Sequence, residues 1–477
     1  MESKPRARAS HGLYWILKPG ALFLALICSA LCSLPANALA GQELLSLDRA
    51  RSLALEQNNL LKIARSQVEE KEALIDKMAA KQFPKVSLGG FGAYNSNPPD
   101  IRIRTGELDF LLEPVGGASG PLGFLSPLPG ADIPLVQGSS WPFVLHGTVI
   151  QPLSMLPRIH TGVAAARIEK KMALSGLAAL GQSIGSKVEQ CYCALQVTEA
   201  EIAARRAEIR YGESRLHHGR NAVELGELLA ANLTGLEVEL LEARMELEKE
   251  LNKRRQLVYA LNLLIGRPVE GELRVEQELP EPAPRRSLAA YLEAARRYNP
   301  EMTKAGQQVA LAEKQIIAVK QADYPEIYAF GSVIHQEGAP LISENFGLVG
   351  LGASWDLLDF GASKAERLVS RQQKIQALEL EENTARVVEN KIASQYSALA
   401  HADALLSLAK KNRRYRLQLL SLARDQVAQQ LELDQVEFEA RWKLAESEAE
   451  LQGALAERFL ALQQLERLAG GKATASR

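Results

Sequence analysis

The chain has 477 residues, and its 56 lysines and arginines nearly balance its 57 aspartates and glutamates, for a formal net charge of −1. A balance this close to neutral offers no basic surface to nucleic acid, so we exclude nucleic-acid binding as the main activity. The sequence has four cysteines, of which Cys191 and Cys193 lie beyond the leader described next. Two cysteines are too few for a disulfide scaffold or a zinc site with four cysteine ligands.

The first forty residues have the pattern of a secretory signal peptide, which we predict at 1–40. Basic residues precede an apolar core at 21–27, and Ala38-Leu39-Ala40 supplies the small–x–small cleavage pattern. A membrane anchor is the alternative, but the apolar run is far shorter than the ~20 residues that span a bilayer. Each leader cysteine follows a bulky aliphatic residue, so a lipid anchor is not expected. Because the leader holds four basic side chains and one acid, the mature chain carries −4.

Beyond the leader, nearly the same pattern occurs twice. Residues 44–94 match 285–335 at a constant offset of 241, and residues 151–266 match 355–470 at an offset of 204. Each unit is predicted as a long helix, a short strand, a loop, a second strand and two further long helices. Units of about 200 residues are far longer than solenoid repeats, so the pattern indicates an internal duplication. The matching pairs include Asn58 and Asn299, Ala64 and Ala305, Pro84 and Pro325, Gly90 and Gly331, and Gly266 and Gly470.

The stretches between turn signals are predicted as helices of coiled-coil length. From 229 to 247, leucine and alanine recur in steps of four and three with Glu, Lys and Arg between them, which is a heptad seam. No proline or glycine interrupts 236–265, so about 30 residues can form one helix roughly 45 Å long. Residues 162–211 are likewise free of proline. For these stretches alone, a solvated structural coiled coil without a channel is the open alternative.

Four short segments break the helical period: 86–94, 143–151, 327–335 and 346–355. The first and third each follow a proline that ends the preceding helix. Each is about nine or ten residues long, which suits a tilted membrane-crossing strand. Four strands are too few to close a barrel of useful bore, so we expect strands from other subunits to complete the sheet and remove its open edges.

Two proline-rich stretches lie between these elements. Residues 95–141 hold seven prolines and many glycines, and we predict a large exposed loop that caps one end of the barrel, either plugging its mouth or binding a molecule outside the cell. The other stretch joins the two repeats. The predicted organisation is a signal peptide at 1–40, a first repeat at 41–266, a linker at 267–287, a second repeat at 288–471 and a short tail at 472–477.

Six stretches taken together carry a family resemblance, although no single one is specific. They are ALEQNNLLKIA and AARRYNPEMTKA, each followed by a proline and a Gly-rich strand, QPLSMLPRIHTGVAAARI and WDLLDFGASKAERL at strand-to-helix turns, and LNLLIG and LERLAG at the repeat ends. In their order and duplication, behind a signal peptide, they resemble the TolC-like outer-membrane efflux and secretion channels, or outer membrane factors. The match covers about 44–470.

The resemblance implies a mostly α-helical homotrimer in the outer membrane of a Gram-negative bacterium. Each protomer would give four strands to a twelve-stranded β-barrel in outer-membrane lipid, and the long helices would continue as a periplasmic coiled-coil barrel. The implied function is the passive exit duct of a tripartite efflux pump or a type I secretion system, with a periplasmic adaptor (a membrane fusion protein) and an inner-membrane transporter as partners. No enzymatic activity and no cofactor is implied. The alternative is a periplasmic coiled-coil scaffold or adaptor without a pore.

The resemblance also implies an acidic pair at the periplasmic entrance, and Asp434 and Glu437 stand at the matching positions. Three residues apart, they share one helix face, and a trimer would turn them into a ring of carboxylates that selects cations. The alternative is that they are ordinary solvent-facing acids. The candidate entrance latch is Arg424, Asp425 and Gln430, and the turn glycine expected there is replaced by Ala428-Gln429-Gln430.

The two helix tips are the candidate docking sites for the adaptor, although their residues are equally compatible with ordinary helix turns. The docking candidates are Arg215, Leu216, Gly226, Leu228, Leu431 and Leu433. The seven histidines are scattered. His217 and His218 are adjacent, and neighbours on a helix diverge by ~100°, so we predict no metal site.

Overall fold

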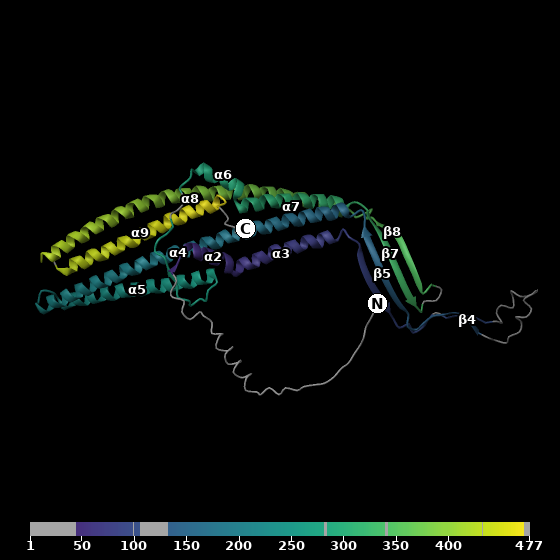
Figure 1. Cartoon of the computed structure of the whole chain (residues 1–477), viewed down its shortest axis with the longest axis horizontal. Coiled ribbons are helices and arrows are strands. Elements are labelled where there is room, and N and C mark those ends of the chain that lie inside the picture. The colour runs from purple at the N-terminus through teal and green to yellow at the C-terminus, as the bar shows by residue number, and fades with distance from the viewer. Residues whose placement is uncertain are drawn as a thin grey trace, which may run out of the picture.

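The structure, a computed structural model, describes residues 44–98, 100–104, 132–280, 284–338, 342–431 and 433–471. A bundle of very long helices leads at one end into a small sheet (Figure 1). The predicted signal peptide and the tail 472–477 lie outside the described residues. Among the described residues, no helix combines the length and the apolar character that spanning a membrane requires.

Each half of the chain contributes two short helices and two long ones. In the first half these are α2 (Leu47–Gln57), α3 (Asn59–Ala80), α4 (Leu156–Glu224) and α5 (Ala230–Ile265), and in the second half α6 (Leu288–Tyr298), α7 (Pro300–Ala322), α8 (Ala362–Ala428) and α9 (Asp434–Leu468). The helices α4 and α8 run unbroken for 69 and 67 residues. Each packs along its length against the shorter helices of its own half (Figure 1). The predicted coiled-coil lengths are therefore confirmed.

The prediction of one long helix at the start of each repeat was wrong, because that helix is divided at Asn58 and at Asn299. The backbone is extended at both residues, with ψ of 125°, and the side-chain oxygen of each caps the helix that follows. Asn58 Oδ1 accepts from Leu60 N at 3.0 Å, and Asn299 Oδ1 accepts from Glu301 N at 2.9 Å. Asparagine favours this N-cap geometry over a helix interior, which explains the break.

Four strands form the main sheet, in the order β2 (Lys85–Gly92), β5 (Phe143–Pro152), β7 (Glu326–Glu337) and β8 (Asn345–Ser354). All pairs are antiparallel. The four predicted strands are therefore confirmed, with ends that differ by one or two residues. In the described part of the chain, β2 and β8 each have a neighbouring strand on one side.

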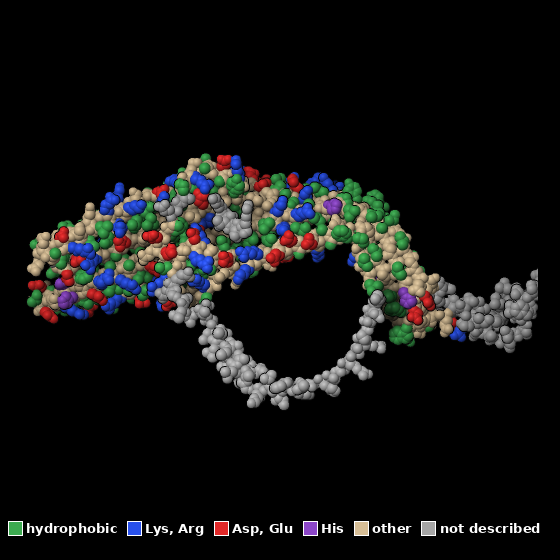
Figure 2. Space-filling model, viewed as in Figure 1, with side chains coloured by type: hydrophobic (Ala, Val, Ile, Leu, Met, Phe, Trp, Pro, Cys, Tyr) green, Lys and Arg blue, Asp and Glu red, His purple; other side chains and the backbone are tan. Residues whose placement is uncertain are grey.

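The register gives the sheet two different faces, because directly paired residues point to the same side. On one face lie large aliphatic side chains that are mostly exposed, such as Val86 at 73 %, Val349 at 93 % and Leu351 at 73 %. The other face carries a row of small polar residues, in which Thr148 Oγ1 lies 3.0 Å from Ser332 Oγ. Figure 2 shows charged side chains spread over the helices, whereas the sheet surface is largely hydrophobic.

The predicted loop at 95–141 contains strand, which corrects the expectation of an irregular segment. β3 (Asp100–Arg104) and β4 (Asp132–Gln137) pair antiparallel, while 105–131 lies outside the described residues. Charged and β-branched residues alternate in Asp-Ile-Arg-Ile-Arg, a period that favours a strand even in a proline-rich region. In the predicted linker, β6 (Arg274–Val275) pairs parallel with β1 (Leu44–Leu45).

The largest buried core lies at mid-length, where α2, α4, α5 and α9 meet. It includes Tyr192, Leu261 and Ile265, all fully buried. The Tyr192 hydroxyl donates to Leu45 O at 2.9 Å and accepts from Glu276 N at 3.0 Å, so the core also fixes the small β1–β6 sheet. A second buried core, formed by residues of α6, α8 and α9, lies at the matching position in the second half of the chain.

Candidate functional site

The site lies at the tips of the two long helical hairpins, far from the sheet (Figure 1). The α4–α5 turn has Gly226 at φ +76°, and the α8–α9 turn has Gln430 at φ +58°. Their backbone amides make equivalent bonds of 3.0 Å, Gly226 N to Val223 O and Gln430 N to Val427 O. Gln430, 204 residues after Gly226, therefore adopts the left-handed conformation without a glycine, at a cost of about 1–2 kcal/mol.

Asp434 and Glu437 begin α9, where the helix dipole favours negative charge. The structure brings both predicted ring residues together in the first turn, and each has a cationic or histidine partner in the same protomer. Asp434 Oδ1 lies 2.5 Å from His218 Nε2 on α4. Glu437 Oε1 accepts from Arg424 Nε at 3.1 Å and from Arg441 Nη2 at 2.5 Å.

These contacts keep both carboxylates ionised at neutral pH. For Asp434, the hydrogen bond with His218 lowers the pKa below its ordinary value, against a smaller opposing effect of desolvation. For Glu437, desolvation raises the pKa, but the hydrogen bonds from Arg441 and Arg424 outweigh it together and the net pKa is lowered.

The latch candidates occupy different places around the α8–α9 turn. Arg424 bridges α8 to α9 through Glu437. The backbone carbonyl of Asp425 accepts from Gln429 N at 3.1 Å, and Gln430 forms the left-handed turn itself. Of the three latch candidates, Arg424 is thus the one whose side chain bonds to a member of the acidic pair, Glu437.

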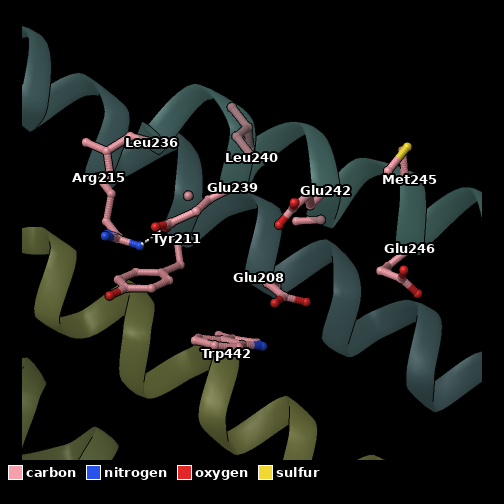
Figure 3. Close-up of a pocket in the computed structure, with 12 residues that line it drawn as sticks. Glu208, Tyr211, Arg215, Leu236, Glu239, Leu240, Glu242, Met245, Glu246 and Trp442 are labelled. Atoms are coloured by element: carbon pink, nitrogen blue, oxygen red, sulfur yellow. Dashed lines mark hydrogen bonds and ion pairs between the residues drawn. The ribbon is translucent and has the colours of Figure 1, made fainter. Parts of the chain in front are cut away.

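The side chains that join α4 to α9 were missed by sequence reasoning. Besides the His218 contact, the Tyr211 ring stacks on Trp442, with centroids 5.5 Å apart and an interplanar angle of 18°. The Tyr211 hydroxyl also donates to Glu439 Oε2 at 3.4 Å. Figure 3 shows Tyr211 of α4 lying next to Trp442 of α9. No local pattern marks these contacts, because they join residues more than 200 positions apart.

A groove runs along this part of the molecule, made of two cavities that share Arg215, Leu236 and Glu239. The cavity nearest the tip has a volume of about 820 Å³, and the next, drawn in Figure 3, about 580 Å³. An ion pair between Arg215 and Glu239 crosses from α4 to α5. Its lining mixes charged, polar and apolar side chains.

The docking candidates divide by exposure. Leu431 and Leu433 are 68 % and 57 % exposed, and Leu228 and Leu433 line the cavity nearest the tip. Leu216 is only 8 % exposed, because it packs into the hairpin, so it cannot offer its side chain to a partner. Within the described parts of the chain, no group of three or more His, Cys, Asp and Glu side chains is placed to hold a metal ion.

Comparison with known proteins gives a match at the level of structure. No protein-family model matches the chain, and no curated protein sequence matches it either. Three solved structures are each similar over 89 % of this chain. The outer membrane protein VceC of Vibrio cholerae has 14 % sequence identity and a TM-score of 0.67, and the match covers 96 % of its length. The CmeC outer membrane channel of Campylobacter jejuni has 14 % identity and a TM-score of 0.69, with 85 % of its length covered, and the MtrE outer membrane channel of Neisseria gonorrhoeae in its open state has 16 % identity and a TM-score of 0.67, with 89 % of its length covered. The mostly helical protomer with a small sheet that the sequence resemblance implies is confirmed, and the chain has the fold of the TolC-like outer-membrane channels.

Proposed function

We propose that this protein is one subunit of a trimeric outer-membrane channel, the passive exit duct of a tripartite efflux pump or a type I secretion system. The observation that carries the proposal is the two-faced sheet at the end of a charged helical body. The similar structures named above are described as outer-membrane proteins or channels, which supports the same placement.

The exposed aliphatic face fits a lipid environment. Val86, Leu88, Val333, Val349 and Leu351 share that face and are each more than 70 % exposed. Soluble monomers rarely expose a contiguous apolar patch of this kind. The opposite face, with its Ser and Thr row, suits a water-filled interior, and strands that alternate in this way are typical of outer-membrane barrels.

The open edges of the sheet call for further strands. β2 and β8 are full-length strands, and among the described residues each is paired on one side only. Strand edges of that length that lack a partner favour pairing with another chain. Three copies, each giving four strands, would close a twelve-stranded barrel. The helices would then extend into the periplasm, and α4 alone, with 69 residues, is about 100 Å long at ~1.5 Å per residue.

The acidic pair would sit at the far, periplasmic entrance of the duct. Trimer symmetry would collect three copies of Asp434 and Glu437 around the axis, forming a filter for cations. The groove beside them, with the exposed Leu431 and Leu433, would receive a periplasmic adaptor, and an inner-membrane transporter would supply the energy. Opening would be driven by the partner's tighter binding to the open state.

One matched pair of substitutions tests the lipid-facing assignment. Val349 and Leu348 are neighbours on β8 and point to opposite faces. Val349→Arg should destabilise the folded trimer in detergent or membrane by about 2–4 kcal/mol, whereas Leu348→Arg, facing the interior, should cost much less. Folded trimer is read on unheated gels and by thermal denaturation. Equal losses for the two variants would contradict the assignment.

Conductance of the purified mature chain in a planar bilayer tests the duct. We expect cation-selective steps that millimolar divalent cations block, and both properties should weaken in Asp434→Ala/Glu437→Ala. Glu457→Ala, which removes an exposed acid twenty residues farther along α9, should leave them unchanged. A chain that stays soluble without detergent and never conducts would instead be a scaffold or adaptor without a pore, and the proposal would be wrong.

A further inference from the structure

A histidine joins α4 to α9 at the level of the acidic pair. His218 Nε2 lies 2.5 Å from Asp434 Oδ1, with the two side chains 26 % and 55 % exposed. The contact lies at the tip end of the line where α4 packs against α9, here called the α4–α9 seam. The stacked pair Tyr211 and Trp442 lies about two helix turns farther from the tip. Any motion that moves the start of α9 away from α4 must break the His218–Asp434 contact.

The arginines around this contact already have carboxylate partners of their own. On α4, Arg215 pairs with Glu239 of α5, and Arg220 pairs with Glu237 of α5. These pairs hold α4 to α5, within one hairpin, and do not cross to α9.

On the α9 side, the remaining charges are equally committed. Glu437 is held by Arg424 of α8 and by Arg441 of α9 itself. Glu439 accepts from the Tyr211 hydroxyl, whose pKa is raised, chiefly by desolvation, so that it stays neutral. Arginine stays charged at every physiological pH.

Two further titratable groups lie close to the contact. His217 is exposed on α4, with its ring centroid 5.7 Å from that of His218, and Glu227 lines the same cavity as His218. Histidine is the side chain that ordinarily changes charge between about pH 5 and 8, while carboxylates stay ionised there. Among the side chains that bond α4 to α9 here, His218 is therefore the one whose residue type can change charge in this range.

We propose that His218 and Asp434 form a pH-sensitive clasp that holds α9 against α4 when the histidine is protonated. The clasp rests on the proposed function, in that its opening would loosen the duct's entrance. A protonated imidazole makes a charge-assisted bond to the carboxylate, which is stronger than the bond from a neutral ring. Acid therefore favours the closed tip, and a rise through the range of histidine titration releases it.

The expected effect is modest for one protomer and larger for a trimer. An exposed ion pair shifts an equilibrium about two- to five-fold, so the closed-to-open ratio of each protomer should fall by that factor as His218 loses its proton. If three protomers open together the factors multiply, and the combined change reaches about ten- to a hundred-fold.

Trp442 offers a reporter of the seam that does not depend on conduction, because it stacks on Tyr211 across the contact. Of the four tryptophans of the chain, Trp15 belongs to the predicted signal peptide, so changing Trp141 and Trp355 to Phe leaves Trp442 alone in the mature chain. Its emission is then followed from pH 5 to 8.5 in the full-length mature trimer in detergent, and conductance is recorded over the same range. The variants are His218→Gln, which can still bond to Asp434 but cannot gain a proton, and His217→Gln as the matched control.

We expect a pH-dependent shift of Trp442 emission, and a rise of open probability with pH, in the parent and in His217→Gln, and neither in His218→Gln. A Trp442 signal that does not change with pH, or one that His218→Gln leaves in place, would overturn the clasp. If the Trp442 signal depends on pH through His218 but no variant conducts at any pH, the clasp stands and the proposed channel function fails.

Discussion

Replacing Asn299 by alanine should loosen the junction between α6 and α7 and its attachment to α9. The Asn299 side chain is the N-cap of α7, accepting from Glu301 N at 2.9 Å and Met302 N at 3.1 Å. Its amide also donates to Leu468 O at 2.9 Å, across to the end of α9. At 3 % exposure, no water can replace these bonds without a rearrangement.

The magnitude follows from the bonds that are lost. Removing an N-cap side chain costs about 1 kcal/mol, and leaving a buried carbonyl unsatisfied costs about 1–3 kcal/mol more. The local stability should fall by about 2–4 kcal/mol, and the amides of Glu301 and Met302 should exchange with solvent about 30- to 800-fold faster, at ten-fold per ~1.4 kcal/mol. Hydrogen–deuterium exchange of the intact trimer, read by mass spectrometry, measures this change.

Two further variants separate the capping contacts of Asn299 from its bond to Leu468. Asn299→Asp keeps the capping oxygen but turns an oxygen, instead of a donor, toward the Leu468 carbonyl. It should therefore keep Glu301 and Met302 better protected than Asn299→Ala does, while losing the attachment to the end of α9. Asn58→Ala removes the equivalent contacts in the first half, a cap to Leu60 N and a donor to Leu264 O at 3.0 Å, and should loosen its own junction similarly. Exchange at parental rates in both alanine variants would refute this account of the junctions.

Three further outcomes are expected. Glu189 is 5 % exposed and is bonded by Arg51 of α2 and Arg467 of α9. Glu189→Gln should lower the free energy of unfolding by about 3 kcal/mol, because two partly buried cations lose their counter-charge. The thermal unfolding midpoint of the trimer measures this change, and a shift below one degree would contradict it. Gly226→Ala should destabilise its turn by about 1 kcal/mol and Gln430→Gly should stabilise its turn by a similar amount, since both positions have positive φ. The free energy of unfolding from chemical denaturation measures both effects. If it changes in the same direction for the two variants, backbone strain is not the cause. The Asp359 carboxylate accepts hydrogen bonds from Ser363 and Gly361 at the start of α8, and these lower its pKa from 3.8 to about 2. Its stabilisation of the helix start should be complete above pH 4 and be lost as the pH falls through 2. Asp359→Asn should remove this pH dependence from amide exchange at the start of α8, and a dependence that persists would exclude Asp359 as its source.

Much of the architecture could be predicted because it depends on local periods. The four strands follow from alternation and flanking prolines, and the long helices from uninterrupted heptads. The breaks at Asn58 and Asn299 were missed although both residues favour an N-cap and Pro300 follows Asn299. The bonds that anchor both side chains reach carbonyls some 170 to 210 positions away, which no local pattern indicates. The β3–β4 pair was missed because prolines and glycines outweighed a short alternating run.

The candidate site was predictable only in part. The positions of Asp434 and Glu437 came from the resemblance to a family, and the structure places them side by side at the start of α9. Their partners could not be foreseen, because His218 belongs to the other half of the chain and Arg424 to the preceding helix. The left-handed Gln430 was hidden because the residue type gives no sign of positive φ. The common origin of the two halves stays a prediction, although their turns and caps are equivalent.

The unbroken helices α4 and α8 have a mechanical consequence. Each lies across the joint where the shorter helices of its half end, α2–α3 and α5 beside α4, and α6–α7 and α9 beside α8 (Figure 1). In each half the break and the helix end lie at the same level, because Asn58 bonds to Leu264 near the end of α5 and Asn299 bonds to Leu468 at the end of α9. At that level α4 or α8 continues past them without a break. A load applied at the tips therefore has to pass this level chiefly through α4 and α8, the two helices that continue unbroken from the tips toward the sheet.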